Sequence, residues 1–186
     1  SHLVDTLLSQ GIELSGIMKV FVPEHGLRGN FDDGQEVESG KDPRTGIPVI
    51  SLYGKRKKPL PEDLEGIDLV VFDIQDVGTR IYTYIATMAY AMQSCAKYNK
   101  EFIVLDRPNP IGGDTIEGNL LVTEYASFVG RYPIPMRHGL TIGELAYLFN
   151  NHFKIGCDLE VIRMKGWKRH MYFENTGLPW IAPSPN

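Results

Sequence analysis

The stretch Ile67–Tyr84, which reads IDLVVFDIQDVGTRIYTY, predicts how the chain folds. Its apolar run Leu69–Phe72 is short, continuous and bounded by polar residues, which is typical of a strand that is buried on both faces. After a polar turn, apolar residues return at helical spacing from Ile81 onward. A buried strand followed at once by a helix is the first half of a βαβ unit, so this stretch predicts a parallel sheet.

The rest of the chain continues the alternation of strands and helices. The apolar pattern predicts helices over residues 3–10, from Pro61 and after Thr141, and strands over residues 17–22, 47–52, 101–105 and 158–164. Thr141 and Glu144 have the spacing of a capping box, and residues 30–46 and 111–136 are expected to be long loops. We therefore predict an α/β fold, a single domain whose mostly parallel sheet of about four or five strands has helices on both faces.

The composition excludes several classes of protein. The 186 residues are 42% hydrophobic and 23% charged, with a formal net charge of −4, and they contain no long block of positive charge, so a nucleic-acid partner is not expected. No apolar run approaches the roughly 18 residues of a membrane span. Cys95 and Cys157 form no disulfide framework, and Cys95 is expected to pack in the core.

Both ends of the chain suggest a piece of a longer protein. The sequence opens directly in a helical pattern and closes on the proline-rich segment Ala182–Asn186, and no signal peptide is visible.

Three of the predicted strands end in a polar cluster that is led by a carboxylate. The clusters are Glu24 with His25, then Asp73 with Asp76 and Arg80, and then Asp106 with Arg107 and Asn109. The carboxyl ends of parallel strands lie along one edge of a sheet, where ligands bind in open α/β folds. One such carboxylate most often caps a helix or forms a turn. Three of them, each followed by an arginine within a few residues, favour a binding cleft.

The common catalytic motifs are missing from the sequence. It contains no G-x-G-x-x-G after a strand, no H-E-x-x-H and no G-x-S-x-G, and no histidine and carboxylate pair has metal-ligand spacing, so we expect neither a cofactor nor a bound metal. Carboxylates, arginines and aromatic side chains remain, and glycoside hydrolysis uses a carboxyl group that protonates the departing oxygen and usually a second carboxylate. Glu24 suits the acid role, because it follows a buried strand and Pro23, where desolvation would raise its pKa. Aromatic residues that could stack on a sugar, or simply pack in the fold, are Tyr53, Tyr82, Tyr132, Trp167 and Trp180.

Six blocks of the sequence resemble one known family. They are PEHGLRG (23–29), FDIQDVGTRIYTY (72–84), LDRPNPIGG (105–113), EGNLL (117–121), YPIPMRHGLTIGELA (132–146) and GLPWIAPSPN (177–186). Together they resemble the exo-β-N-acetylmuramidases of the NamZ type, which remove N-acetylmuramic acid from the non-reducing end of peptidoglycan fragments. The resemblance implies that residues 1–186 are a Rossmann-like N-terminal catalytic domain. It also implies that the family's first strand and its smaller C-terminal domain are not in this sequence.

The resemblance also assigns roles to individual residues. The family's suspected catalytic glutamate lies in the PEHG motif and falls on Glu24. Asp73 and Asp76 are candidates for the second catalytic group, and assistance from the N-acetyl group of the substrate is the alternative. Substrate contacts are expected from His25, Arg28, Arg80, Tyr82, Asp106, Arg107, Asn109, Glu117 and His138. N-acetylmuramic acid carries a lactyl carboxylate, which a guanidinium binds well, and the candidates for this contact are Arg28, Arg80, Arg107, Arg131 and Arg137. His138 could either bind the sugar or shape its loop.

The expected partner is thus a small carbohydrate, a muramyl sugar or muropeptide, and the expected location is the bacterial cell envelope. Two alternatives stay open at this point. A non-catalytic carbohydrate-binding module could be built on the same fold, since fold does not dictate function. A metal-dependent hydrolase is the other alternative.

Overall fold

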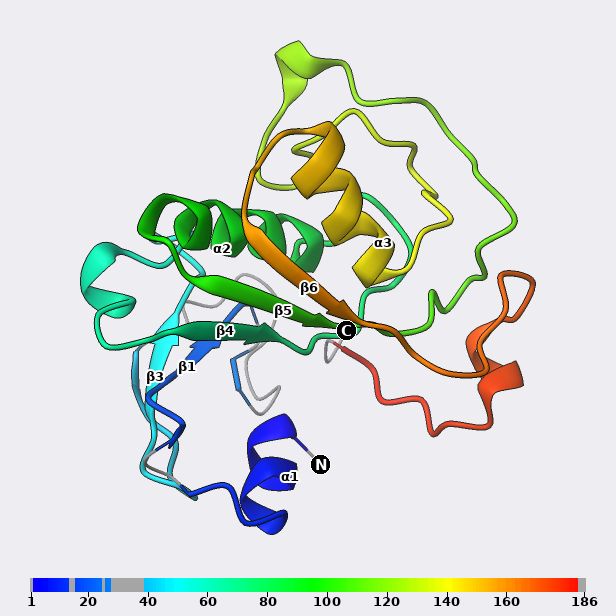
Figure 1. Ribbon diagram of the computed structural model, residues 1–186. Helices are drawn as coiled ribbons and strands as arrows, with labels where there is room; N and C mark the ends of the chain where they lie inside the picture. Colours follow the sequence, from blue (N-terminus) through cyan, green and yellow to red (C-terminus); the bar gives the residue numbers. More distant parts are fainter. Residues whose placement is uncertain (1, 14–15, 25, 28–38, 184–186) are drawn as a thin grey trace. The chain divides into compact units, whose positions relative to one another are not determined.

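The computed structural model describes residues 2–13, 16–24, 26–27 and 39–183. His25 and Arg28, both predicted to contact substrate, lie outside the described residues. The chain divides into two compact units, one made of residues 1–67 with 184–186 and the other of residues 68–183 (Figure 1). The fold class is α/β, as predicted.

The first unit contains the helix α1 (Leu3–Ser9) and a three-stranded sheet in the order β1-β3-β2. Strand β1 (Val20–Val22) pairs in parallel with β3 (Pro48–Ser51), within the two segments predicted to be strands. Strand β2 (Gly40–Lys41) pairs antiparallel with β3, although its residues fall in a segment predicted to be a loop. A two-residue strand of glycine and lysine has no hydrophobic pattern by which it could be predicted.

A short 3₁₀ helix, η2 (Pro61–Asp63), follows the sheet of the first unit, where proline and two acidic residues predicted a helix start. The carboxylate of Asp63 accepts a hydrogen bond from the backbone N–H of Leu60 at 2.7 Å, and it also pairs with the guanidinium of Arg56. These two contacts of Asp63 hold the residues that precede the turn in place.

The second unit is built on a parallel sheet in the order β4-β5-β6. Strands β4 (Leu69–Phe72), β5 (Glu101–Leu105) and β6 (Asp158–Ile162) all lie in segments predicted to be strands. The described strands form two three-stranded sheets instead of the single sheet of four or five strands that the sequence predicted. The hydrophobic pattern identifies strands but not their pairing partners, which explains the difference.

Two helices pack on one face of this sheet, α2 (Tyr84–Tyr98) and α3 (Ile142–Tyr147) (Figure 1). Both contribute to the same hydrophobic core, in which Phe102 and Val104 of β5 are fully buried. The two helices of this unit share one face of its sheet, because their apolar sides merge into a single core. Helix α2 begins three residues later than the first apolar residue after the turn, Ile81, whose side chain is exposed.

The predicted core role of Cys95 is confirmed. The residue lies in α2 and is completely buried, and burial raises the pKa of its thiol to about 12. A thiol in this state is protonated at neutral pH and is therefore a poor nucleophile.

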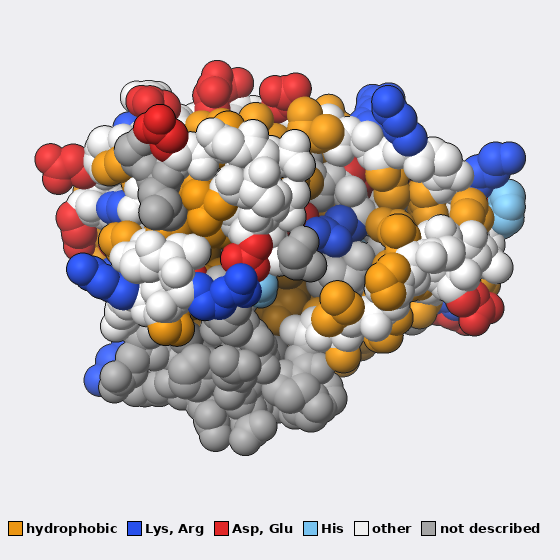
Figure 2. Space-filling view, turned by 90° about the horizontal axis from the view of Figure 1, so that it is seen from below, with side chains coloured by type: hydrophobic (Ala, Val, Ile, Leu, Met, Phe, Trp, Pro, Cys, Tyr) orange, Lys and Arg blue, Asp and Glu red, His pale blue; other side chains and the backbone are white. Residues whose placement is uncertain are grey.

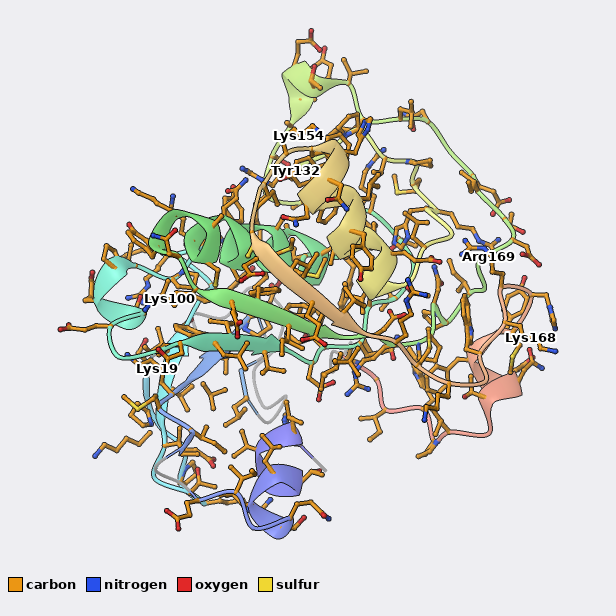
Figure 3. All side chains as sticks on the ribbon, in the orientation of Figure 1. Lys19, Lys100, Tyr132, Lys154, Lys168 and Arg169 are labelled. Carbon is orange, nitrogen blue, oxygen red and sulfur yellow. The ribbon has the colours of Figure 1, made fainter. Side chains whose placement is uncertain are left out.

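Helix α3 begins at the predicted capping box. The backbone N–H of Thr141 donates to the Glu144 carboxylate at 2.9 Å, and the N–H of Glu144 donates to the Thr141 hydroxyl at 3.2 Å. The helix continues into a π-helical turn (Leu148–His152) that leads to β6. Tyr132, labelled in Figure 3, lies beside this turn, and its ring contacts Phe149 and Phe153 at centroid distances of 4.6 Å.

The remaining segments of the second unit are irregular, as predicted for residues 111–136. They include two 3₁₀ turns, η3 (Thr123–Tyr125) and η5 (Phe173–Thr176). Among the described residues on the face shown in Figure 2, acidic, basic and apolar side chains are interspersed. None of the helices in the described part of the chain is long and apolar enough to cross a membrane.

Candidate functional site

The carboxyl ends of β4 and β5 meet in an ion pair between Asp73 and Arg107. Oxygen Oδ1 of Asp73 accepts hydrogen bonds from Nε and Nη2 of Arg107, at 2.8 and 2.5 Å. The two residues are 34 positions apart in the sequence, so the predicted convergence of these two strand ends is confirmed. The second oxygen of Asp73, Oδ2, makes no hydrogen bond with the described residues, and the pair is partly open to solvent.

Asp76 and His138 form a buried pair behind this edge of the sheet. Oδ2 of Asp76 accepts a hydrogen bond from the backbone N–H of Gly78 at 2.8 Å and lies 3.3 Å from Nε2 of His138. The backbone N–H of Leu140 donates to Nδ1 of His138 at 3.2 Å, which leaves Nε2 as the ring nitrogen that bears a proton, on the side of Asp76. The His138 side chain is 0% exposed, which matches the loop-shaping alternative.

Amide side chains link three loops at this edge. Asn109, in the loop after β5, donates to the carbonyl of Leu140 at 2.9 Å and accepts from the N–H of Ile111 at 3.1 Å. Gln75, in the loop after β4, donates to the carbonyl of Pro108 at 2.9 Å. The loops after β4, after β5 and before α3 therefore hold one another in place.

Gly78 packs directly against Asn109. It has φ of +87°, and a Cβ there would lie 2.5 Å from Oδ1 of Asn109 and 2.6 Å from Cγ1 of Ile111. We expect Gly78→Ala to lower the free energy of unfolding by about 2–4 kcal/mol, because left-handed strain adds to overpacking. Urea denaturation measures this change.

Gly166→Ala is the matched control for Gly78→Ala. Gly166 has a similar φ of +84°, but a Cβ there meets no atom within 4 Å, so only the backbone strain of about 1–2 kcal/mol is expected. Equal losses in the two variants would contradict the view that the close approach of Gly78 to Asn109 holds the loops together.

Asp106 caps helix α3. Its Oδ1 accepts from the backbone N–H of Gly143 at 2.8 Å, and its Oδ2 accepts from the Thr141 hydroxyl at 3.2 Å. Asp106 was predicted to contact substrate, but both of its carboxylate oxygens are engaged at the N-terminus of α3. Capping a helix was the alternative role expected for a carboxylate at the end of a strand. Burial raises the pKa of the Asp106 carboxyl, although these hydrogen bonds act to lower it.

The raised pKa of Asp106 predicts how stability depends on pH. The folded protein holds this proton more tightly than the unfolded chain, so the stability from Asp106 is complete below pH about 4 and decreases as pH rises through the raised pKa. Asp106→Asn removes this titration. We therefore expect the free energy of unfolding of the wild type, relative to the variant, to decrease in urea titrations as pH rises above about 4. Asp114→Asn, at an exposed position, is the control, and a difference that grows with pH would show that the hydrogen bonds outweigh burial.

Three of the candidate arginines are engaged within the second unit. Nη1 of Arg80 donates to the carbonyls of Asn119 and Ile134, at 2.8 and 2.5 Å, and the side chain is buried. The other two make side-chain contacts: Arg137 with the Glu117 carboxylate at 2.7 Å and the Ile111 carbonyl, and Arg131 with the Tyr90 hydroxyl at 2.8 Å and Gln93 at 3.2 Å. These contacts fix the path of the irregular segment 111–136.

Several of the aromatic residues that could have stacked on a sugar instead make ring contacts with neighbouring side chains, as expected if they pack in the fold. The pairs are Tyr82 with Tyr84, Tyr132 with Phe149 and Phe153, Trp180 with Phe173, and Tyr53 beneath Lys57.

The sequence did not point to Arg169, which lies at the start of α3 (Figure 3). Its Nη1 donates to Glu144 at 2.7 Å, and its Nη2 donates to the carbonyls of Gly113 and Gly139, at 2.9 and 2.5 Å. Arg169 stands in an irregular segment with no motif around it, so no sequence signal could have identified this role.

Glu24 belongs to the first unit. It follows β1 and Pro23, and the residue is 7% exposed, so the predicted burial of this carboxyl group is confirmed. That it joins Asp73 in one cleft stays a prediction. Across the described ranges, no three His, Cys, Asp or Glu side chains are grouped closely enough to hold a metal ion.

The sequence matches a known protein family along its whole length. A family model described as "Exo-beta-N-acetylmuramidase NamZ, N-terminal" matches residues 1–186. Over 167 residues the chain is 61% identical to the peptidoglycan beta-N-acetylmuramidase NamZ of Bacillus subtilis (strain 168), and the match covers 90% of the chain and 40% of that protein.

Two crystal structures of DUF1343 family proteins from Bacteroides fragilis NCTC 9343 are also similar. The first has a TM-score of 0.90 at 48% identity and covers 100% of this chain and 46% of that one. The second has a TM-score of 0.75 at 36% identity, with 93% and 45% covered. The chain spans less than half of the length of each of these relatives.

Proposed function

The chain belongs to the exo-β-N-acetylmuramidase NamZ family, in its N-terminal region, and on this premise we propose that it is the catalytic part of a glycoside hydrolase. The enzyme would release N-acetylmuramic acid from the non-reducing end of peptidoglycan fragments. The observation that carries the proposal is the 61% identity to the B. subtilis peptidoglycan beta-N-acetylmuramidase. Such a substrate belongs to the bacterial cell envelope, where we expect the protein to act.

We assign the proton-donating role to Glu24. Glycoside hydrolysis requires a carboxyl group that is protonated at the pH of the reaction and that donates this proton to the departing glycosidic oxygen. Glu24 is buried at the end of β1, and glycosidases commonly place the acid group in such a partly desolvated position. If the second carboxylate attacks the sugar directly, the Glu24 carboxylate then takes a proton from the water that hydrolyses the intermediate, which returns Glu24 to its initial state. If the second carboxylate instead activates the water, it takes that proton itself, and both carboxyl groups return to their initial states by exchange with solvent.

We assign the second carboxylate role to Asp73 rather than Asp76. This group must be anionic and must reach the sugar, either directly or through a water molecule. Asp73 is held beside the guanidinium of Arg107, and its Oδ2 is not engaged by the described residues, so this oxygen is available to a substrate. Asp76 is buried, and its Oδ2 is engaged by Gly78 and faces His138, so it is suited to positioning the loops.

The proposed activity is tested with two chromogenic substrates. The full-length protein is expected to release 4-nitrophenol from 4-nitrophenyl β-N-acetylmuramide far faster than from the corresponding N-acetylglucosaminide. Saturable binding of a muramyl disaccharide without turnover of either substrate would favour the carbohydrate-binding module instead. Turnover that is abolished by a chelator and restored by a divalent metal would favour the metal-dependent hydrolase.

A further inference from the structure

We propose that Arg107 binds the lactyl carboxylate of the N-acetylmuramic acid residue and thereby determines the preference for this sugar over N-acetylglucosamine. The inference rests on the proposed function and assigns one residue to its substrate specificity. The two sugars differ only in the lactyl group, so discrimination requires a contact with its carboxylate or with its bulk. A guanidinium is the side chain that binds a carboxylate with two parallel hydrogen bonds.

The contacts of the other described candidates leave Arg107 as the best placed one. Arg80 is buried, and its Nη1 donates to two backbone carbonyls. Arg131 lies over the ring of Tyr90 at 4.2 Å and is bonded to the hydroxyl of that residue. Arg137 already binds a carboxylate, that of Glu117. Each of these guanidinium groups is committed to the fold of the segment 111–136.

Arg107 has one side of its guanidinium engaged and the other side free. The side formed by Nε and Nη2 faces Asp73, whereas Nη1 makes no hydrogen bond with any described residue. The end formed by Nη1 and Nη2 is a second pair of parallel N–H donors, with the spacing of a carboxylate. The side chain as a whole is 39% exposed, so Arg107 is partly open to solvent and to a ligand.

The surroundings hold Arg107 in position before a ligand binds. Asp73 orients the guanidinium, and the following residue, Pro108, is fixed through its carbonyl by Gln75. A side chain that is already ordered loses less conformational entropy on binding, which strengthens the contact. Arg107 also follows β5 at the carboxyl edge of the parallel sheet, where ligands bind in this class of fold.

The pairing with Asp73 suggests how recognition could be linked to catalysis. Arg107 would lie between two carboxylates, the lactyl group on its free end and Asp73 on its engaged side. The lactyl contact would then set the position of the sugar relative to Asp73, the proposed second catalytic group. Substrates that lack the lactyl group would lose this placement as well as one ionic contact.

The test compares two inhibitors of the full-length enzyme, N-acetylmuramic acid and its methyl ester, in which a methyl group replaces the negative charge of the carboxylate. In the wild type we expect the acid to bind about 10-fold or more tightly than the ester, since charge-assisted hydrogen bonds to a carboxylate are strong. In Arg107→Ala the two inhibition constants should become equal. Arg107→Lys, which keeps the charge without the paired donors, should give an intermediate ratio.

The ratio of the two constants separates recognition from a loss of structure. A misplaced Asp73 or a less stable fold would weaken both inhibitors equally and leave their ratio unchanged. Arg163→Ala is the matched control, because Arg163 is an exposed arginine that follows the neighbouring strand β6. A preference for the acid that persists in Arg107→Ala, or that disappears equally in Arg163→Ala, would overturn the assignment.

The same experiment distinguishes failure of the inference from failure of the proposed function. If the wild-type enzyme hydrolyses the muramide but Arg107→Ala leaves the acid-to-ester ratio unchanged, only the assignment of Arg107 is rejected and the proposed function stands. A wild-type protein that turns over no muramide would remove the proposed function, and the assignment of Arg107 with it.

Discussion

Glu24→Gln in the full-length protein is expected to lower kcat on a muramyl disaccharide by about 100- to 10,000-fold, the usual contribution of a general acid. Glutamine is nearly isosteric with glutamic acid but has no proton to give. The size of the loss should depend on the leaving group of the substrate. A sugar alkoxide needs a proton in order to depart, whereas 4-nitrophenolate is a much weaker base, so the loss on 4-nitrophenyl β-N-acetylmuramide should be much smaller.

The difference between the two substrates tests the specific role of Glu24. An acid catalyst predicts a large loss on the disaccharide, a smaller loss on the nitrophenyl glycoside, and disappearance of the decline in activity at high pH that reflects ionisation of the acid. Glu65→Gln, a change at an exposed glutamate of the same unit, should leave both rates unchanged. Equal losses on both substrates would argue that Glu24 acts otherwise, and unchanged rates would exclude it from catalysis.

The placement of Asp73 beside Arg107 could be predicted from sequence for a simple physical reason. The apolar runs that end at Phe72 and Leu105 identify two buried strands, and a strand–helix–strand connection makes such strands parallel neighbours. The residues that follow them must then lie side by side. The order of the two strands alone brings Asp73 close to Arg107, whatever paths the loops take, so the sequence pattern is enough to predict that they lie together.

The partners of Arg80, Arg137 and His138 could not be predicted in the same way. Each depends on the path of the segment 111–136, which the backbone holds through isolated contacts such as the hydrogen bond from the Arg80 N–H to the Met136 carbonyl. A segment without periodicity carries no signal of where its carbonyl groups lie. For that reason the sequence could name the charged residues but not tell a ligand-binding arginine from one that supports a loop.

Asp106 illustrates a third limit. Its position after β5 predicted a place at the carboxyl edge of the sheet, and the capping box of α3 was predicted independently. That these two features meet, with Asp106 bonded to both Thr141 and Gly143, follows from the packing of α3 against β5 and β6. Such a contact between separate elements is determined by the whole core, and a sequence pattern describes each element alone.

Asp73→Asn is expected to lower kcat on the nitrophenyl muramide by about 100-fold or more while leaving the fold intact. The amide oxygen can still accept from Arg107, so the arginine stays oriented, but the charge that would attack the anomeric carbon or activate water is lost. The ion pair is partly solvent-exposed, so its loss should change the free energy of unfolding by no more than about 1 kcal/mol. Kinetics and urea denaturation of one preparation measure both quantities.

Asp76→Asn should mainly lower stability rather than kcat, the reverse of Asp73→Asn, because Asp76 is buried between Gly78 and His138. An amide oxygen in the place of Oδ2 could keep the contacts with Gly78 and His138, but the NH2 group would then take the buried place of Oδ1, where no described residue offers a hydrogen-bond partner. A mismatch at a buried site costs about 1–3 kcal/mol, so this variant should lose stability first and activity only through the displaced loop. If Asp76→Asn instead kept its stability and lost kcat, while Asp73→Asn kept its activity, the two carboxylates would exchange roles. Arg107 would then bind the sugar without orienting the second catalytic group.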